Sequence, residues 1–212
     1  MFRQPSSTSS NVSSKYNVQF SGVVIETTVT NKGSTAEDWV IEIRTLHNGR
    51  RIILGLDCEW RCPDKWGYLN KVATLQLCVD NKCLIIQMVY MDYFPQSLKD
   101  FLNDPNVTCV GVEVNDDVSR IRNEYGLSCS STADIRELAS RSYSLDAIFM
   151  YKPKPGLKDL ALLVAGLDME KPRYVVKSDW QAAVLDHEQI RYACIDAYAS
   201  HRIGRKLLGL GN

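Results

Sequence analysis

The sequence predicts an α/β fold in which helices flank a mixed sheet of five to six strands. Strand and helix patterns follow one another as a strand, a helix, three strands, a helix, a strand and then several helices. Helices that cover a mixed sheet bury the apolar faces of both kinds of element. A length of 212 residues provides a full core for one such domain and is too short for two ordinary ones.

The chain is expected to divide into a tail and one domain. Residues 1–15 are rich in Ser and Asn and poor in apolar side chains, which predicts a disordered tail. Residues 16–212 would form the domain. Its first element would be a single strand at 16–30, where β-branched residues alternate with polar ones.

The first helix is expected to begin at Ser34, because Glu37 stands three residues later and completes a capping-box pattern. It would end near Asn48, which is followed by glycine. Its buried side would carry four apolar residues, namely Trp39, Val40, Ile43 and Leu46.

The other elements follow from the same patterns. A central strand is expected at 51–60, since residues 52–56 are apolar on both faces. Further strands are expected at 71–79, 82–88 and 107–114, with a hairpin turn at Asp80-Asn81. Further helices are expected at 96–103, 116–125, 132–143, 156–166 and 186–208.

Composition narrows the class of protein. The apolar runs are too short to span a membrane, and the N-terminus lacks the apolar middle region of a secretory signal. A formal net charge of zero argues against a basic coat for non-specific nucleic-acid binding. Seven cysteines, most of them in apolar segments, predict buried free thiols in a reducing compartment. Cys58 and Cys62 have no second Cys/His pair with which to form a zinc site.

Acidic residues gather at three points. Asp57 and Glu59 end the central strand, and side chains at i and i+2 share one face, where two carboxylates favour a divalent cation between them. Asp117 follows the strand at 107–114, with Asp116 or Asn115 as the helix cap. A polar strand end or an ordinary helix cap would account for either pattern taken alone.

The third point is a pair on the last helix. Tyr192 and Asp196 are separated by four residues, so their side chains lie on the same helix face. Taken alone, such a pair is more often a Tyr–Asp hydrogen bond on a packed helix face.

The three motifs together resemble those of the 3′–5′ exonucleases that use four acidic residues and a tyrosine. This DEDDy type includes ribonuclease D and the Werner-syndrome exonuclease domain. The matching motifs are a strand ending Asp-x-Glu-Trp, a Gly-Val run leading to Asp, and Tyr-Ala-x-x-Asp-Ala-Tyr, at 54–60, 111–117 and 192–198. Connecting segments at 71–77, 156–161 and 178–180 match too, and the resemblance covers residues 35–210.

The resemblance implies a ribonuclease-H-like (DnaQ-like) fold and hydrolysis of single-stranded nucleic acid from the 3′ end, releasing nucleoside 5′-monophosphates. It implies two Mg²⁺ or Mn²⁺ ions held by Asp57, Glu59, Asp117 and Asp196. Asp57 would be shared by both ions, Glu59 and Asp196 would bind the ion that carries the nucleophile, and Asp117 the other. Tyr192 would orient the attacking water.

Candidate substrate-binding residues lie beside the motifs. Trp60 and Trp66 could stack on a terminal base or could be core or lid residues. Lys158 and Arg173 belong to clusters that could contact phosphates or form a solvated loop surface, together with Lys152, Lys154, Lys171 and Lys177. The histidines fit no ligand pattern, and His187 is expected to lie at a helix start.

The chain looks most similar to a plant subgroup of this family, which favours RNA over DNA as the substrate. That likeness implies cytoplasmic or nuclear location, RNA-silencing proteins as partners, and a six-membered ring as the assembly. One departure concerns Glu113, where the family usually has a small residue. The alternative hypothesis is a catalytically silent member that binds nucleic acid or acts in assembly.

Overall fold

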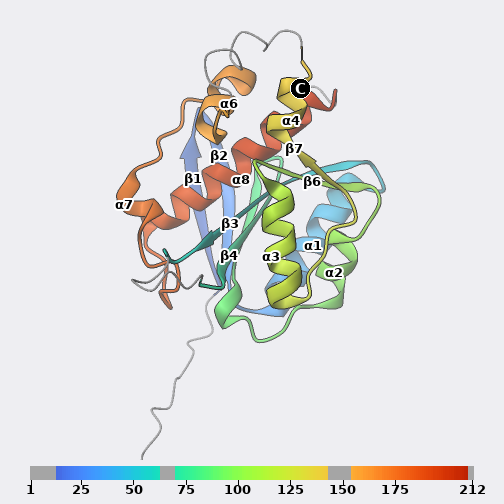
Figure 1. Cartoon of the computed structure of the whole chain (residues 1–212). Coiled ribbons are helices and arrows are strands. Elements are labelled where there is room, and N and C mark those ends of the chain that lie inside the picture. Colours follow the sequence, from blue (N-terminus) through green and yellow to red (C-terminus); the bar gives the residue numbers. More distant parts are fainter. Residues whose placement is uncertain (1–12, 63–69, 143–153, 210–212) are drawn as a thin grey trace, which may run out of the picture.

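The computed structural model describes residues 13–62, 70–142 and 154–209. Its centre is a mixed sheet of seven strands in the order β1-β2-β5-β4-β3-β6-β7 (Figure 1). The strands are β1 Ser13–Phe20, β2 Val23–Thr30, β3 Ile52–Trp60, β4 Val72–Val79, β5 Lys82–Gln87, β6 Val107–Gly111 and β7 Thr132–Asp134. The α/β class with helices on both faces of a mixed sheet is confirmed.

Two groups of helices cover the sheet. One face packs against α1 Gly33–His47, α2 Gln96–Leu102 and α3 Val114–Tyr125. The other packs against α4 Ile135–Ser140, α6 Leu157–Ala165 and α8 His187–Leu207. The short elements η1 Met88–Tyr90 and α7 Arg173–Val176 complete the fold. Among the described residues, no helix has the length and apolar character needed to cross a membrane.

The strand expected at 16–30 is a hairpin. β1 and β2 pair antiparallel from Ser13↔Thr30 to Phe20↔Val23, so the turn consists of two residues. Both turn residues have positive φ, +48° at Ser21 and +76° at Gly22, the conformation that favours right-twisted hairpins. β1 begins at Ser13, inside the segment expected to be a tail, whereas residues 1–12 lie outside the described residues.

The start of the first helix also differs from the expectation. α1 begins at Gly33 with Lys32 as N-cap, and the Lys32 side chain makes no capping hydrogen bond. The Gly33 N–H instead donates to Asp92 Oδ1 at 2.8 Å, so a residue distant in sequence replaces the expected local cap. Leu46, expected to be buried, is 57% exposed because the buried face of α1 continues from Ile43 to the half-buried His47, four residues further on.

The segment expected to be a helix at 132–143 begins as a strand. β7 adds to the sheet edge beside β6 over three residues, and α4 follows with Asp134 as N-cap, which accepts from the Arg136 N–H at 2.8 Å. The strand expected at 107–114 is shorter and ends at Gly111, because α3 already starts at Val114.

Close contact between α8 and β3 positions the centre of the molecule (Figure 1). Gly55 of β3 faces the backbone of α8, where a Cβ would overlap the Ala197 carbonyl oxygen and stand 2.7 Å from the His201 nitrogen. Gly204 of α8 also lies close to β6, because a Cβ at this position would clash with the Val110 side chain. The two glycines let the helix lie directly on the strands, so its buried face contacts the end of β3.

Gly55→Ala is therefore expected to destabilise the fold by about 3 kcal/mol, since the added methyl group must displace helix backbone. Urea unfolding followed by circular dichroism measures the change. Gly156→Ala is the matched control, because its Cβ would meet only the Asp159 side chain at 3.7 Å. Equal stability of the two variants would show that α8 does not rest on Gly55.

Candidate active site

The end of β3 carries the first two carboxylates. Parallel pairing with β6 runs from Ile52↔Val107 to Gly55↔Val110, and β6 ends one residue later. Asp57 and Glu59 extend past that point while β3 stays paired with β4. Both side chains are half-buried and alternate with Leu56 and Cys58, which are buried in the core on the α1 side. Strand alternation thus turns both carboxylates toward α8.

Helix α8 supplies Tyr192 and Asp196 from one buried face. Its start is fixed by a reciprocal cap, in which Asp186 Oδ1 accepts from the Gln189 N–H at 2.8 Å and Gln189 Oε1 accepts from the Asp186 N–H at 3.0 Å. Tyr192 is 8% exposed and Asp196 is 1% exposed. The expected placement of His187 at the helix start is confirmed.

The three carboxylates converge. Oxygens of Asp57, Glu59 and Asp196 all lie within 4.8 Å of one another. Asp196 Oδ1 is buried and makes no hydrogen bond within the described structure. A buried carboxylate oxygen without a donor is costly, and a hard divalent cation prefers such oxygens as ligands. The residues therefore fit a divalent cation.

A lysine lies inside this carboxylate cluster. Lys171 Nζ is 2.6 Å from Asp196 Oδ2 and 5.3 Å from the centre of the Tyr192 ring. Burial works against its charge, but the nearby carboxylates of Asp196 and Asp57 outweigh this and raise the pKa of Lys171. The sequence indicated Lys171 only as one of several lysines that could contact phosphate. Lys154 also precedes a proline yet is exposed, so local sequence did not distinguish the two.

Burial and mutual repulsion disfavour ionisation of the cluster. Desolvation, followed by repulsion from Asp196, raises the pKa of Asp57 to about 7. Desolvation and the Asp57 charge raise the pKa of Glu59 well above its usual value. The pKa of Asp196 is raised by burial, although Lys171 counteracts the shift. Without a metal ion, the cluster holds protons at a pH where isolated carboxyl groups would lose them.

Asp117 lies at the edge of this group. It is 8% exposed in the first turn of α3, and its pKa is raised to about 8 by desolvation and then by the Asp57 charge. It is not among the three residues whose oxygens lie within 4.8 Å of one another. The expected cap residues Asp116 and Asn115 do not cap α3, because its N-cap is Glu113.

The stability of the metal-free protein is expected to fall as pH rises from about 4 to 8. Asp57 and Asp117 have folded-state pKa values near 7 and 8, above the unfolded value of about 3.9. The folded state therefore binds more protons, and this stabilisation is lost as pH rises through the folded values. Urea unfolding in EDTA at pH 5 and pH 8 measures the effect, and Asp57→Asn should reduce the slope. A stability that rises across this range would contradict these pKa directions.

Tyr192 has Asp196 and Trp180 as neighbours. Asp196 lies one helical turn further along α8, and its charge acts on the phenol. The Trp180 ring lies 6.0 Å from the Tyr192 ring at a tilt of 55°. Desolvation and the charge of Asp196 raise the pKa of Tyr192 above its usual value, so the phenol stays protonated.

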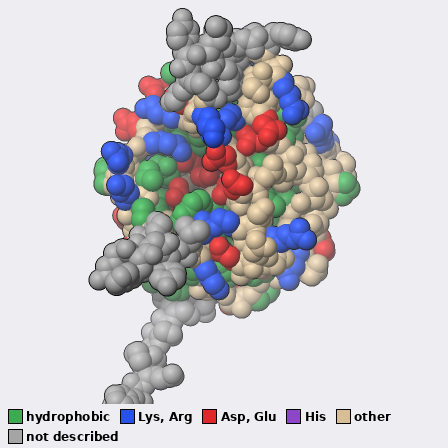
Figure 2. All heavy atoms as spheres, viewed as in Figure 1, with side chains coloured by type: hydrophobic (Ala, Val, Ile, Leu, Met, Phe, Trp, Pro, Cys, Tyr) green, Lys and Arg blue, Asp and Glu red, His purple; other side chains and the backbone are tan. Residues whose placement is uncertain are grey.

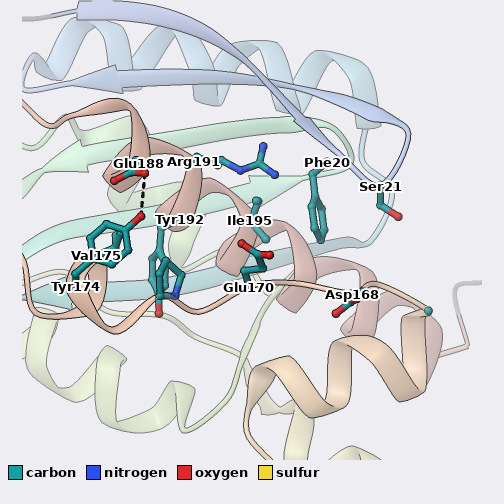
Figure 3. Close-up of a pocket in the computed structure, with 12 residues that line it drawn as sticks. Phe20, Ser21, Asp168, Glu170, Tyr174, Val175, Glu188, Arg191, Tyr192 and Ile195 are labelled. Carbon is teal, nitrogen blue, oxygen red and sulfur yellow. Dashed lines mark hydrogen bonds between the residues drawn. The ribbon is translucent and has the colours of Figure 1, made fainter.

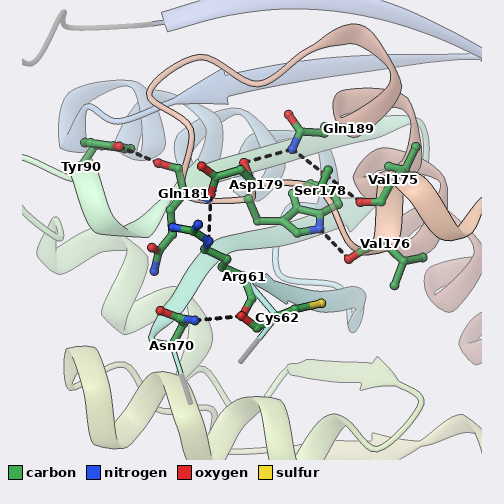
Figure 4. Close-up of polar contacts among 11 residues, drawn as sticks. Arg61, Cys62, Asn70, Tyr90, Val175, Val176, Ser178, Asp179, Gln181 and Gln189 are labelled. Atoms are coloured by element: carbon green, nitrogen blue, oxygen red, sulfur yellow. Dashed lines mark hydrogen bonds and ion pairs between the residues drawn. The ribbon is translucent and has the colours of Figure 1, made fainter. Parts of the chain in front are cut away.

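The segment around Trp180 forms a hydrogen-bonded support (Figure 4). The Trp180 indole N–H donates to the Val176 carbonyl at 3.3 Å, and Gln189 Nε2 donates to Ser178 Oγ at 2.8 Å. Arg61, just after β3, lies 3.9 Å from the Asp179 carboxylate. These contacts tie the loop before α8 to the end of β3, where the carboxylates lie.

The predicted substrate-binding residues are scattered. Trp60 is partly buried, with the Arg120 guanidinium 4.1 Å from its ring centre, so one ring face is already covered. Lys158 on α6 and Arg173 on α7 are exposed. Lys154 and Lys177 are exposed too, whereas Trp66 and Lys152 lie outside the described residues.

Glu113 points to a partner other than the cluster. It has a left-handed backbone, with φ of +56°, which explains why a small residue suits this position. Its carboxylate accepts from Arg136 Nη1 at 2.8 Å, and that pairing lowers its pKa. The negative charge that Glu113 adds to the family pattern is thus paired with Arg136, which lies outside the carboxylate cluster.

The surface around the cluster has a characteristic charge pattern. Figure 2 shows acidic side chains near the middle of one face, with Lys and Arg side chains around them. A cavity of about 480 Å³ opens beside Tyr192 on the outer side of α8 (Figure 3). Its lining includes Asp168, Glu170 and Glu188 but only one arginine, Arg191, so it does not suit an anionic ligand.

The fold and the cluster define an α/β domain with a candidate divalent-cation site at the end of its central strand. A family model described as 3′–5′ exonuclease matches residues 28–210. The chain belongs to this 3′–5′ exonuclease family, which confirms the resemblance inferred from the motifs.

Relatives support this assignment. A 3′–5′ exonuclease of Arabidopsis thaliana is 31% identical over 158 residues, 74% of this chain and 53% of that protein. The mouse bifunctional 3′–5′ exonuclease/ATP-dependent helicase WRN is 29% identical over 76% of this chain and 11% of its own length. The chain thus spans about half or less of these relatives. The structure of Escherichia coli ribonuclease D, 19% identical with a TM-score of 0.66, covers 85% of this chain and 44% of its own and shows the shared fold.

Proposed function

We propose that this chain is an active 3′–5′ exonuclease that shortens single-stranded nucleic acid, with RNA favoured, and releases nucleoside 5′-monophosphates. The observation that carries the proposal is the buried convergence of Asp57, Glu59 and Asp196, including one oxygen without a hydrogen bond. Family membership supplies the reaction type, and the carboxylate cluster supplies a place where it can occur.

Four carboxylates would hold the ions. Asp57, Glu59 and Asp196 form the compact group, and Asp117 approaches it from α3. Two bound divalent cations would supply a metal-activated water and stabilise the leaving 3′ oxygen. The Asp57 carboxyl interacts electrostatically with both Asp196 and Asp117, which supports the family role of a ligand shared by both ions.

Tyr192 would orient the attacking water. Its raised pKa keeps the hydroxyl protonated at neutral pH, so it can donate or accept a hydrogen bond but is not a general base. Packing of its ring against Trp180 holds the phenol beside the carboxylates. A fixed hydrogen bond to the nucleophile is the contribution that this geometry supports.

Single-stranded RNA labelled at its 5′ end tests the proposal. With Mn²⁺ or Mg²⁺, a ladder of products shortened from the 3′ end is expected, together with free nucleoside monophosphate. Excess EDTA should stop the reaction. Full activity in EDTA, or cutting of a circular single strand, would contradict it.

RNA preference is proposed from the likeness to the plant subgroup. RNA and DNA of the same sequence should be degraded in one tube with different labels. A higher kcat/KM for RNA is expected. A higher kcat/KM for DNA would make DNA the preferred substrate and would leave the exonuclease proposal intact.

Assembly and partners are proposed on the same likeness. A six-membered ring, contact with RNA-silencing proteins, and a cytoplasmic or nuclear location would follow from it. Sedimentation of the purified chain tests the ring directly, since a hexamer has six times the mass of the 24.0 kDa monomer.

A further inference from the structure

A second cavity lies at the other end of α8 and β3 from the carboxylate cluster. It has a volume of about 460 Å³ and includes three arginines, two histidines and one carboxylate in its lining: Arg50, Arg51, Arg205, His47, His201 and Asp80. Arg205 follows Asp196 by nine residues on α8, which corresponds to about 13 Å along the helix. The two sites therefore share a helix but no residues.

Asp80 anchors one wall of this cavity. It lies in the turn between β4 and β5 with φ of +51°. Its Oδ1 is 2.5 Å from Arg205 Nη1, and its Oδ2 is 3.2 Å from His47 Nε2. The single carboxylate is thus already engaged by groups from α1 and α8.

His201 is a fixed, buried part of the same wall. It is 1% exposed, and its Nδ1 lies 2.8 Å from the Ile53 carbonyl, which can only accept a hydrogen bond. Its Nε2 accepts from the Asp80 backbone N–H at 3.0 Å. Both ring nitrogens are therefore used in the neutral form, and the imidazole holds the Asp80 turn in place.

Arg50 and Arg51 leave the cavity with uncompensated positive charge. Both are exposed, and neither has an ion pair or a side-chain hydrogen bond within the described chain. The three arginines and Asp80 together carry a net charge of +2. One wall is fixed and paired, while the other offers two free guanidinium groups next to each other in sequence.

We propose that this cavity binds a phosphate group. Guanidinium groups match phosphate oxygens with paired hydrogen bonds, and two adjacent arginines provide several such donors. The volume is in the range of small-ligand sites, roughly 300–1,000 Å³. The phosphate would lie against Arg50 and Arg51, with His47 beside it and the Asp80 carboxylate already engaged by His47 and Arg205. This site goes beyond the proposed catalytic function and does not depend on it.

Imidazole NMR signals of the full chain in EDTA provide the test. The sequence has only three histidines, and His187 lies at the opposite end of α8 and serves as an internal reference. Titration with inorganic phosphate at pH 7 should shift the His47 signal saturably and leave His187 unchanged. Arg50→Gln combined with Arg51→Gln should raise Kd at least tenfold.

Two control variants distinguish binding in this cavity from a general charge effect and from binding at the carboxylate cluster. Lys206→Gln removes a positive charge from a neighbour of Arg205 that does not line the cavity, and it should bind phosphate like the wild type. Asp57→Asn alters the carboxylate cluster and should also leave binding unchanged. Absence of saturation, or an equal Kd in the double arginine variant, would overturn the proposal.

The source of the phosphate is decided by two larger probes. A nucleoside 5′-monophosphate and an oligonucleotide with a blocked 3′ end are titrated under the same conditions. Shifts caused by the oligonucleotide and weakened in the double variant identify a strand phosphate, whereas shifts caused by the mononucleotide alone identify a small ligand. If inorganic phosphate alone binds and neither probe displaces it, the assignment to a biological phosphate is wrong.

Discussion

Asp196→Asn is expected to lower exonuclease turnover by about a thousandfold or more at saturating Mn²⁺. The substitution removes a charged oxygen from the group of three carboxylates that lie within 4.8 Å. A bound metal contributes several kcal/mol of charge stabilisation, and each 1.36 kcal/mol corresponds to a factor of ten. Initial rates on single-stranded RNA measure the loss. Near-normal turnover would show that Asp196 is not part of the catalytic site.

Asp57→Asn is the matched comparison, because it should be equally inactive but differ in stability. Removing the Asp57 charge relieves repulsion with Asp196 and so should stabilise the metal-free protein. Asp196→Asn instead removes the ion-pair partner of Lys171 at 2.6 Å, and loss of this partner from a partly buried ammonium group is destabilising. Thermal melts in EDTA should therefore rank Asp57→Asn above Asp196→Asn.

Tyr192→Phe is expected to reduce turnover by roughly ten- to a thousandfold, the scale of losing one well-placed catalytic hydrogen bond. The ring would keep its packing against Trp180, so stability should change little. The phenol is not a proposed ligand, and the Mn²⁺ concentration at half-maximal activity should remain near the wild-type value. Activity titrated with Mn²⁺ gives both quantities from one experiment.

Asp196→Asn supplies the contrast in that titration, since it should require more Mn²⁺. If Tyr192→Phe kept full turnover, the proposed role of the phenol would be wrong. If it raised the metal requirement as much as Asp196→Asn, Tyr192 would have to be regarded as part of the ion site. The carboxylate cluster would remain a candidate metal centre in either case.

The sequence predicted the parts of the site that depend on regular geometry. Asp57 and Glu59 share a face because strands repeat every two residues, and Tyr192 and Asp196 share one because helices repeat near every four. Those periodicities persist after folding, so residues far apart in the chain could be assigned to one centre. The family motifs then joined the two pairs.

Features set by distant contacts could not be predicted in this way. Lys171 reaches Asp196 only because the loop before α7 passes the end of β3. The course of this loop cannot be predicted from the residues around Lys171. The Gly33 N–H is capped by Asp92, which lies 59 residues away. β7 is a strand because β6 offers it an edge, although its three residues also suit a helix.

The hairpin at residues 13–30 escaped prediction for a different reason. Ser21-Gly22 is a turn signal, but the flanking residues are rich in β-branched side chains and concealed it. The parallel pairing of β2 with β5 then places this hairpin on the sheet. A seven-stranded sheet results where the sequence indicated five to six strands.

Lys171 gives the metal-free protein a resident counter-ion. Its ammonium group neutralises Asp196 from a loop just before Pro172 rather than from a strand or helix of the core. Binding of a divalent ion at Asp196 would therefore exchange one cation for another, and the displaced lysine would stay beside the site on its loop. There its positive charge would be available to a phosphate group of the proposed substrate strand.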